Sequence, residues 1–356
     1  MASSSASTTR KGLRETTPTV LRNSIVQRLG SRITTAGEIS FPCIPALIDT
    51  YLDRLQSLWD LLGKRFSDKE TSNLRYAVQR VVMEGFRASS QARLVVSYRT
   101  GSPPEPGIVY RVELKLEGME DIYARWVVTR EPPLFGKHAD AKVIEAAGAQ
   151  GSPREVSVLD LGAGTGRNAL ALAALGHPVT AVEPVPALAA ELREAAYRAG
   201  AGVRIVEGDV FSNELSGLEQ KFHLVVLAEV LPHLRGTTEL RPLVSRVAEL
   251  LAPGGRLLLS SFVAMEGYKP DPLAREFAEL AWCSIFTRAD LSFLTEELPF
   301  YRIADESVYT YEKEHLPAGA WPPTGWFEEW ALGRNVFALP AGRVPIELRW
   351  LEYGRR

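Results

Sequence analysis

Apolar runs alternate with helix-like segments along the second half of the chain. Five runs rich in Val, Leu and Ile follow one another from Val156 to Phe262. They are VSVLDLG, PVTAVEP, VRIVEGD, FHLVVLAEV and GRLLLSSF, at 156–162, 178–184, 203–209, 222–230 and 255–262. Because they lack strict alternation and are separated by helical or mixed segments, they predict parallel strands in a sheet that is buried on both faces.

The pattern changes after the fifth run. Segments 271–286 and 287–298 have the spacing of helices, and a mixed stretch follows from residue 300. A Trp-rich segment, 321–337, then precedes a strand-like end, 345–356. We therefore expect more helices and at least one further strand beyond the βα repeats.

A different pattern precedes the repeats. Segments 44–66 and 67–86 repeat apolar residues at helical spacing, and Ser67 and Glu70 stand in capping-box register at the start of the second. Strand-like stretches at 92–99 and 108–118 flank a Pro- and Gly-rich turn, and 119–130 is again helical. We predict that residues 38–150 form a small α+β cap domain of two helices, a hairpin and a linking helix, followed by a second domain at 151–356.

Residues 1–37 are rich in Ser, Thr and Arg, and Glu15 is their only acid. This composition is typical of a flexible tail or of an organelle transit peptide. We expect the tail, and hence a cytoplasmic protein; the plastid stroma is the alternative if the segment is a transit peptide. No uninterrupted apolar stretch suggests a secretory signal.

Composition excludes several functional classes. With 46% hydrophobic and 24% charged residues, a formal charge of −2 and a pI of about 6.3, the chain does not have the basic surface expected for nucleic acid. No apolar run is long enough for a membrane span. Cys43 and Cys283 stand far apart, and the five histidines form no metal-binding spacing, so we expect buried thiols and no metal.

The richest motif is LDLGAGTGRN, residues 159–168. A dinucleotide fingerprint would place its third glycine at position 167, but Arg167 stands there and the third glycine is Gly166. Asp160 precedes the first glycine by two positions. A carboxylate there would repel a pyrophosphate but could accept a hydrogen bond from a cationic amino group.

This stretch resembles motif I of the class I S-adenosylmethionine (SAM)-dependent methyltransferases, and further landmarks follow in that family's order over roughly residues 125–356. The resemblance implies that Glu183 binds the ribose hydroxyls, that Asp209 binds the adenine amino group, and that segment 227–234 lies next to the reacting methyl. It also implies a Rossmann-like α/β fold with a seven-stranded, mostly parallel sheet whose last strand is antiparallel. The implied cofactor-binding residues are Asp160, Gly162, Ala163, Gly164, Gly166, Glu183, Pro184, Gly208, Asp209, Val210, Glu229 and Val230. Within the family, the chain looks most like the tellurite-resistance-type and other small-molecule methyltransferases.

His233 is the candidate catalytic residue because it follows the fourth strand, where donor and acceptor should meet. An imidazole there could remove a proton from the acceptor, or it could simply shape the pocket. Two further segments could contribute: the Trp-rich stretch could line the acceptor site or pack in the core, and Lys137 and His138 could belong to a lid or to a linker.

The expected function is transfer of a methyl group from SAM to an O, N or S atom of a small molecule. AEVLPH, residues 228–233, differs from the NPPY or DPPY signature of amide methylation, and no acid pattern suggests a catechol-type magnesium site. A non-catalytic SAM-binding module and, less favoured, a nicotinamide oxidoreductase remain as alternatives. A homodimer is also possible, since the cap could equally serve dimerisation.

Overall fold

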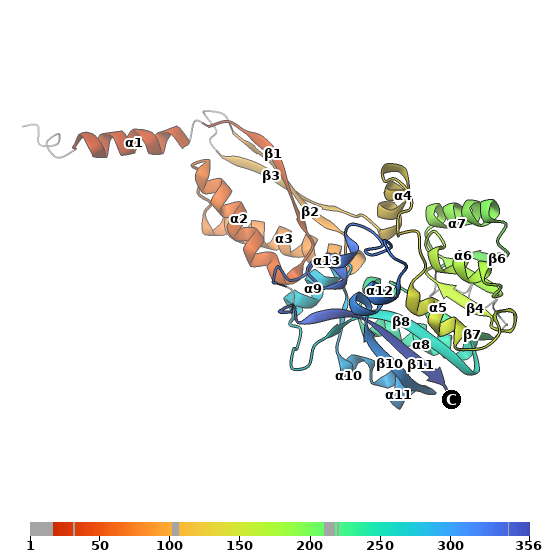
Figure 1. Ribbon diagram of the computed structural model, residues 1–356. Coiled ribbons are helices and arrows are strands. Elements are labelled where there is room, and N and C mark those ends of the chain that lie inside the picture. Colours follow the sequence, from red (N-terminus) through yellow and green to blue (C-terminus); the bar gives the residue numbers. More distant parts are fainter. Residues whose placement is uncertain (1–16, 31–32, 102–106, 210–217, 219–220, 341) are drawn as a thin grey trace, which may run out of the picture. The chain divides into compact units, whose positions relative to one another are not determined.

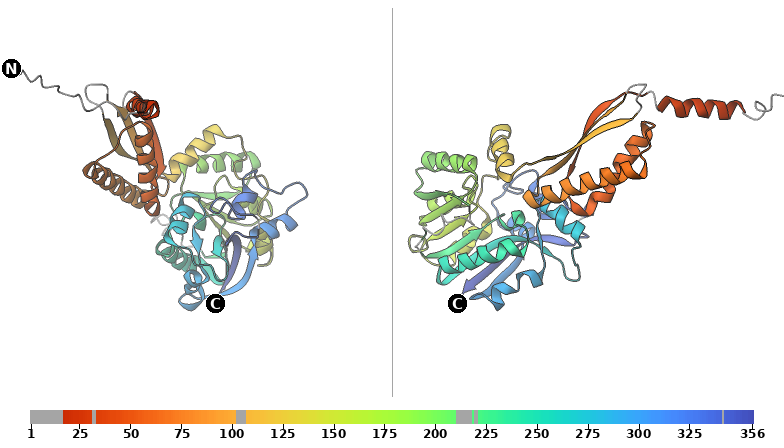
Figure 2. Two further views of the ribbon diagram at one scale, coloured as in Figure 1. Left: turned by 90° about the vertical axis from the view of Figure 1, so that its left-hand side faces the viewer. Right: turned by 180° about the vertical axis from the view of Figure 1, so that it is seen from behind.

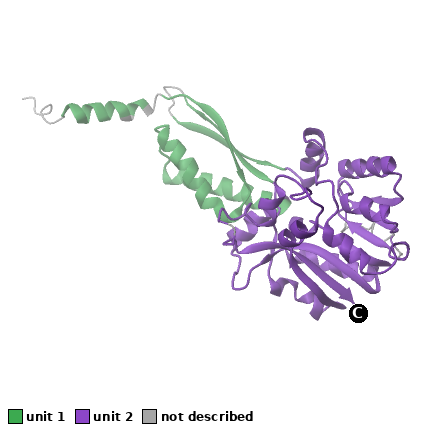
Figure 3. Ribbon diagram, in the orientation of Figure 1, with its two compact units in different colours: residues 1–88, 92–116 green, residues 89–91, 117–356 purple. Residues whose placement is uncertain are grey.

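The computed structural model describes residues 17–30, 33–101, 107–209, 218, 221–340 and 342–356. It divides the chain into two compact units, residues 1–88 with 92–116 and residues 89–91 with 117–356 (Figure 3). The predicted domain boundary at residue 150 therefore falls inside the second unit. Segment 117–150 lies with the large sheet because its helices pack against that unit's core.

The first unit is a three-stranded antiparallel sheet with two long helices. The strands are β1 (Ala36–Pro42), β2 (Arg93–Thr100) and β3 (Ile108–Lys115), in the order β1-β2-β3. The helices are α2 (Ile48–Leu61), after a short 3₁₀ turn η1 (Pro45–Leu47), and α3 (Asp68–Ala88). The predicted capping box is present, since the amide of Ser67 donates to Glu70 and the amide of Glu70 donates back to the Ser67 hydroxyl.

Two elements of this unit were not predicted. Strand β1 was missed because AGEISFP carries little periodicity of its own and is held by pairing with β2, more than fifty residues away. Helix α1 (Pro18–Gly30) lies within the segment predicted as a tail, and the described side chains of this helix are exposed. Its leucines and arginines and one glutamine are residues that favour a helix locally without packing.

The second unit is built on the sheet that the βα pattern predicts (Figure 1). Its main order is β10-β11-β8-β7-β4-β5-β6, and β9 pairs with β8 at the side. Neighbouring strands from β8 to β6 are parallel, whereas β11 runs antiparallel to both β8 and β10. The predicted mostly parallel sheet with an antiparallel last strand is confirmed. Its strands are β4 (Val158–Leu161), β5 (Val179–Glu183), β6 (Val203–Glu207), β7 (Phe222–Leu227), β8 (Leu251–Ala264), β9 (Ile285–Phe286), β10 (Phe300–Ser307) and β11 (Ile346–Arg355).

Helices cover both faces of this sheet (Figures 1 and 2). One core joins the strands to α5, α6, α7, α12 and α13, and the other joins them to α8, α10 and α11. Strands β4 and β5 are buried throughout, and their residues are apolar except for Thr180 and the site acids Asp160 and Glu183. The helices and 3₁₀ turns are α4 (Met119–Thr129), α5 (Ala141–Gly148), η2 (Pro153–Glu155), α6 (Arg167–Ala174), α7 (Pro186–Ala199), η4 (Leu231–His233), α8 (Thr237–Leu250), α9 (Pro272–Leu280), α10 (Arg288–Leu291), α11 (Phe293–Glu296), α12 (Val308–His315) and α13 (Phe327–Ala331).

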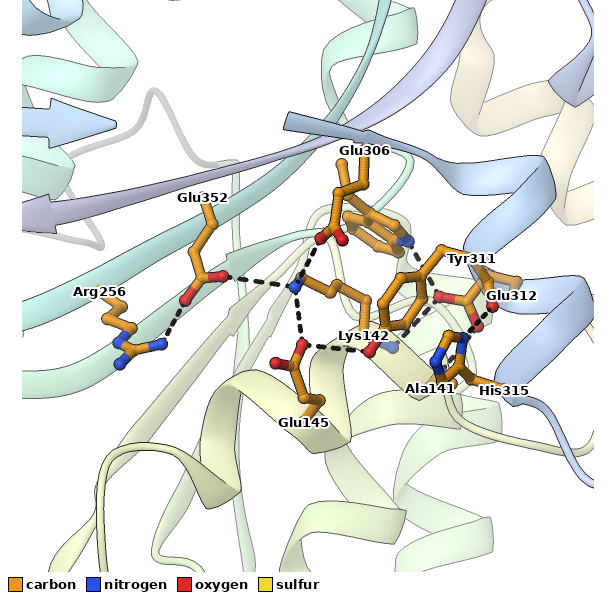
Figure 4. Close-up of polar contacts among 10 residues, drawn as sticks. Ala141, Lys142, Glu145, Arg256, Glu306, Tyr311, Glu312, His315 and Glu352 are labelled. Atoms are coloured by element: carbon orange, nitrogen blue, oxygen red, sulfur yellow. Dashed lines mark hydrogen bonds and ion pairs between the residues drawn. The ribbon is translucent and has the colours of Figure 1, made fainter. Parts of the chain in front are cut away.

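A buried lysine ties helix α5 to the antiparallel edge of the sheet (Figure 4). Lys142 Nζ lies 2.6 Å from Glu145, 2.7 Å from Glu306 on β10 and 3.5 Å from Glu352 on β11. Glu352 is shared with Arg256 on β8, at 2.6 Å. Burial alone would lower the pKa of Lys142, but hydrogen bonds to Glu145 and Glu306 raise it, so the ammonium stays charged.

The two cysteines, Cys43 and Cys283, are free and buried, as predicted. Burial raises the pKa of the Cys43 thiol to about 11, so it is an inert core residue at neutral pH. Among the described residues, no helix combines the length and the hydrophobicity needed to cross a bilayer.

Candidate functional site

The glycine-rich loop joins the buried end of β4 to the start of α6. Gly162 has a φ of 74°, and a Cβ there would lie 2.5 Å from Val230 Cγ2. Gly166 has a φ of 91°, and a Cβ there would lie 2.2 Å from Leu192 Cδ1. Both positions therefore require glycine for backbone conformation and for space. This close packing fixes the loop against α7 and against the end of β7.

A cavity opens above this loop, at the carboxyl ends of β4, β5 and β7, where ligands of open α/β sheets usually bind. Most of the predicted site residues line it: Asp160, Gly162, Ala163, Gly164, Glu183, Pro184, Asp209, Glu229, Val230 and His233. Gly166 and Gly208 do not. Gly166 supports the loop from behind, and the amide of Gly208 donates to the carbonyl of Glu183 at 3.1 Å. Val210 lies outside the described residues.

Asp160 presents an unsatisfied carboxylate to the cavity. Its side chain is 2% exposed, and its Oδ2 has no hydrogen-bond partner among the described residues. Burial, helped by the nearby charge of Asp140, raises its pKa to about 7, although Arg167 opposes the shift. A buried acceptor oxygen without a donor is costly, so a cationic donor in the cavity would relieve that cost.

Glu183 holds the loop and faces the cavity at the same time. Its Oε2 accepts a hydrogen bond from the amide of Gly164 at 2.7 Å, and its Oε1 accepts one from the amide of Val185 at 2.9 Å. Burial raises its pKa, and these two hydrogen bonds oppose the rise. Each carboxylate oxygen has a second lone pair, so fixing the loop and binding a diol are compatible.

A buried charge network beneath the cavity was missed by sequence reasoning. Arg167 donates to Asp140 at 2.7 Å and to Glu229 at 2.8 Å. Asn168 donates to Asp140 Oδ2 and accepts from its amide, both at 2.9 Å. Only Arg167, standing where a dinucleotide motif has glycine, could have signalled this network, because Asp140 and Glu229 are distant in sequence.

Glu229 is held in an unusual backbone conformation. Its φ is 60°, which is uncommon for a residue with a side chain, and its amide donates to the Ser260 hydroxyl at 2.7 Å. Burial raises its pKa, while its hydrogen bond with Arg167 opposes the rise. The strained backbone aims this carboxylate at Arg167 at the edge of the cavity.

His233 lies at the end of η4, beside the aromatic ring of Tyr123. Its Nε2 is 3.2 Å from the Tyr123 hydroxyl, and its Nδ1 has no partner among the described residues. Burial lowers the pKa of His233 to about 4, so the imidazole is neutral at physiological pH. Burial also raises the pKa of Tyr123, so this pair meets as two neutral groups.

The Trp-rich segment packs into the core rather than around the cavity. Phe327 and Trp330 are buried against the sheet, and the indole of Trp330 donates to the carbonyl of Trp282 at 2.9 Å. None of the segment's aromatic residues lines the cavity. The segment before α5 contributes Phe135 to the cavity wall, whereas Lys137 and His138 do not line it. Within the described ranges, no three acidic, histidine or cysteine residues are grouped to hold a metal ion.

The strand order, the glycine-rich loop after the first parallel strand and the buried acids at the next strand ends together define a class I SAM-dependent methyltransferase domain. Residues 158–255 match a family model described as "Methyltransferase domain". The chain thus carries the domain that the sequence motif predicts, and SAM is its cofactor.

Comparison with individual proteins adds little beyond this family match. A search of curated proteins found no match. Similar solved structures include geranyl diphosphate methyltransferase, crystallised with GPP and sinefungin (14% identity, 61% of this chain and 77% of that one, TM-score 0.47). Others are TehB from Haemophilus influenzae (17%, 73% and 80%, 0.41) and the N-methyltransferase NodS from Bradyrhizobium japonicum (16%, 61% and 93%, 0.39). We draw no functional conclusion from similarities of this size.

Proposed function

We propose that this protein transfers the methyl group of SAM to an O, N or S atom of a small molecule and releases S-adenosylhomocysteine. The observation that carries the proposal is the unpartnered Oδ2 of Asp160, which lines the cavity above the glycine-rich loop. A buried carboxylate without a donor suits a cationic ligand and disfavours a diphosphate.

The residues around the cavity fit the parts of this cofactor. Asp160 would receive the amino group, Glu183 the ribose hydroxyls and Asp209 the adenine amino group, with loop glycines leaving room for the ligand. When bound, SAM supplies an electrophilic methyl group on a positively charged sulfur. The protein's own contribution is to orient the acceptor and to exclude water from the cavity.

His233 is proposed to orient the acceptor and to receive its proton transiently. Its neutral imidazole can accept a hydrogen bond from an attacking hydroxyl, amine or thiol. Because its pKa is lowered to about 4, it would pass the proton on rather than keep it.

Two measurements test the proposal in sequence. Isothermal titration calorimetry of the full chain should show binding of SAM and none of NADH; binding of NADH alone would favour an oxidoreductase and overturn it. Incubation with methyl-labelled SAM and a metabolite extract should then give a labelled product and S-adenosylhomocysteine. SAM binding without any label transfer would instead support a non-catalytic SAM-binding module.

Once a labelled product is identified, His233→Ala tests the role of the imidazole. We expect the rate of label transfer to fall by roughly 100-fold or more, as for loss of a proton-accepting group, while the Kd for SAM changes little. A rate within twofold of the unchanged protein would show that His233 only shapes the pocket.

A further inference from the structure

The wall of the cavity beyond the cofactor-binding residues is aromatic. Tyr123, Phe135 and His233 all line it. The ring of Tyr123 lies 5.9 Å from that of Phe135 at 66°, and 6.0 Å from that of His233 at 67°. The rings pack edge to face on one another, and together they give this side of the cavity an aromatic wall. Aromatic rings attract organic cations.

The tyrosine ring is held in place from behind. Trp282 stacks on it at 5.3 Å, and Trp126 meets its edge at 5.1 Å. Trp282 has a φ of 53°, which is strained for a bulky residue, and its carbonyl is fixed by the indole of Trp330. The outer face of Trp126 already carries a cation, since the guanidinium carbon of Arg130 lies 3.4 Å from its ring centroid.

The charge lining the cavity is negative. Five carboxyl groups line it, from Asp160, Glu183, Asp209, Glu229 and Glu239. Arg167 is the one Lys or Arg side chain among the described lining residues, and both Asp140 and Glu229 already pair with it. An anionic acceptor entering this space would therefore meet repulsion that no unpaired Lys or Arg among the described lining residues offsets.

Glu239 follows His233 in the chain and lines the same cavity. It stands in the first turn of α8, and its Oε2 accepts a hydrogen bond from the amide of Arg235 at 2.6 Å. It lies near the ion pair of Arg235 with Glu279, whose two charged atoms are 2.9 Å apart, and its charge acts on Glu279. Unlike Asp160, Glu183 and Asp209, it has no part in the proposed cofactor contacts, so its charge is available to an acceptor.

We propose that the acceptor is an amine on an apolar, ring-bearing body, an inference that rests on the methyl transfer proposed above. The aromatic wall and Glu239 attract the ammonium form, which passes its proton through the imidazole of His233 to water outside the cavity before reaction. The nitrogen lone pair then forms the N–CH₃ bond as the S–CH₃ bond breaks, and the bonding electron pair stays on sulfur. The product leaves as the methylated ammonium ion, so charge and protons balance.

Matched probe compounds test this proposal on the full chain saturated with S-adenosylhomocysteine. Each of three bodies (phenyl, indole and cyclohexyl) carries in turn an amine, an alcohol or a carboxylate head group on a linker of equal length. Isothermal titration calorimetry measures the Kd of each compound. We expect at least one amine to bind about tenfold or more tightly than its matched alcohol, and no carboxylate to bind. The same amine should receive label from methyl-labelled SAM.

Two variants locate the effect. Glu239→Gln keeps the shape of the side chain and should weaken amine binding about fivefold to tenfold, with no change for the alcohol. Glu314→Gln, at an exposed position of α12, should change neither.

The amine proposal is overturned if an alcohol or carboxylate binds as tightly as its matched amine, or if no amine of the set binds the loaded protein. Normal binding of SAM in the same preparation would show that the proposed function itself still stands. Absence of SAM binding would instead remove the proposed function.

Discussion

At the scale of single residues, Asp160 determines the character of the cavity. Its carboxylate is buried next to Asp140 and Glu183, and its outer oxygen has no donor. Such a group destabilises the empty protein but binds a cationic ligand strongly. Removing this charge should therefore stabilise the cofactor-free protein and weaken the binding of the cofactor.

Asp160→Asn tests this reasoning because it removes the charge and keeps the shape. We expect the Kd for SAM to rise roughly 10-fold to 100-fold, the value of a charge-assisted hydrogen bond. The cofactor-free variant should be more stable than the unchanged protein at pH 7, as measured by urea denaturation. Burial raises the pKa of Asp160 in the folded protein to about 7. The unfolded chain therefore releases this proton first, and the free energy of unfolding of the unchanged protein falls as pH rises from about 4 to 7.

The gain in stability of Asp160→Asn over the unchanged protein should accordingly grow across that pH range. Glu155→Gln, at an exposed position of η2, serves as the control and should change neither property. A gain that stayed constant with pH would contradict the raised pKa.

His233 gives a second residue-scale prediction. Since burial lowers its pKa to about 4, an NMR titration of the imidazole should show a midpoint near 4 rather than 6.5. The signal is assigned by its loss in His233→Asn. A depressed pKa in a histidine means that stability falls as pH drops below the ordinary value, because the unfolded state takes up the proton first. A midpoint at 6 or above would mean that the imidazole is solvated.

At the scale of elements, the Lys142 network connects helix α5 to strands β10 and β11 (Figure 4). This connection matters for the site because Asp140, which pairs with Arg167, immediately precedes α5. The carboxylate of Glu312 on α12 also accepts from the amides of Ala141 and Lys142 at the start of that helix. The antiparallel edge of the sheet thus helps to hold the charge network beneath the cavity.

Lys142→Met should cost about 1 to 3 kcal/mol of unfolding free energy, since the buried Glu352 would keep only Arg256 and the more exposed Glu145 and Glu306 would lose the ammonium. Urea denaturation at pH 7 measures the loss. Lys137→Met, at an exposed position nearby, should change stability by less than about 0.5 kcal/mol. Equal effects of the two substitutions would show that the network contributes nothing.

At the scale of the whole molecule, the family match and the cavity lie in the second unit alone. We therefore expect SAM to stabilise the folded state of that unit and to raise the temperature at which it unfolds. At 100 times its Kd, SAM should add about 2.7 kcal/mol, which raises the melting temperature by several degrees. Differential scanning calorimetry of the full chain measures the shift, with NADH at equal concentration as the control. A shift with NADH and none with SAM would contradict the assignment.

The sequence predicted much of the fold of this unit and many of the residues that line its cavity. Apolar runs without alternation marked strands buried on both faces, and spacing within 159–168 distinguished the loop from a dinucleotide motif. These features are local, so a single chain segment carries them. Other features depend on chain segments that are far apart, and the sequence did not reveal them: the pairing of β1 with β2, the Arg167–Asp140–Glu229 network and the contact between Tyr123 and His233.

By itself, then, the sequence determined the succession of strands and helices, the glycine-rich loop and the kinds of residue at the strand ends, because each follows from local periodicity and backbone chemistry. Only the tertiary structure decided which side chains face one another. It placed the Trp-rich segment in the core, brought an unpredicted tyrosine to His233, and left one oxygen of Asp160 without a donor. The physical reason is that burial and pairing are set by packing between distant segments, and the charge states of the site follow from that packing.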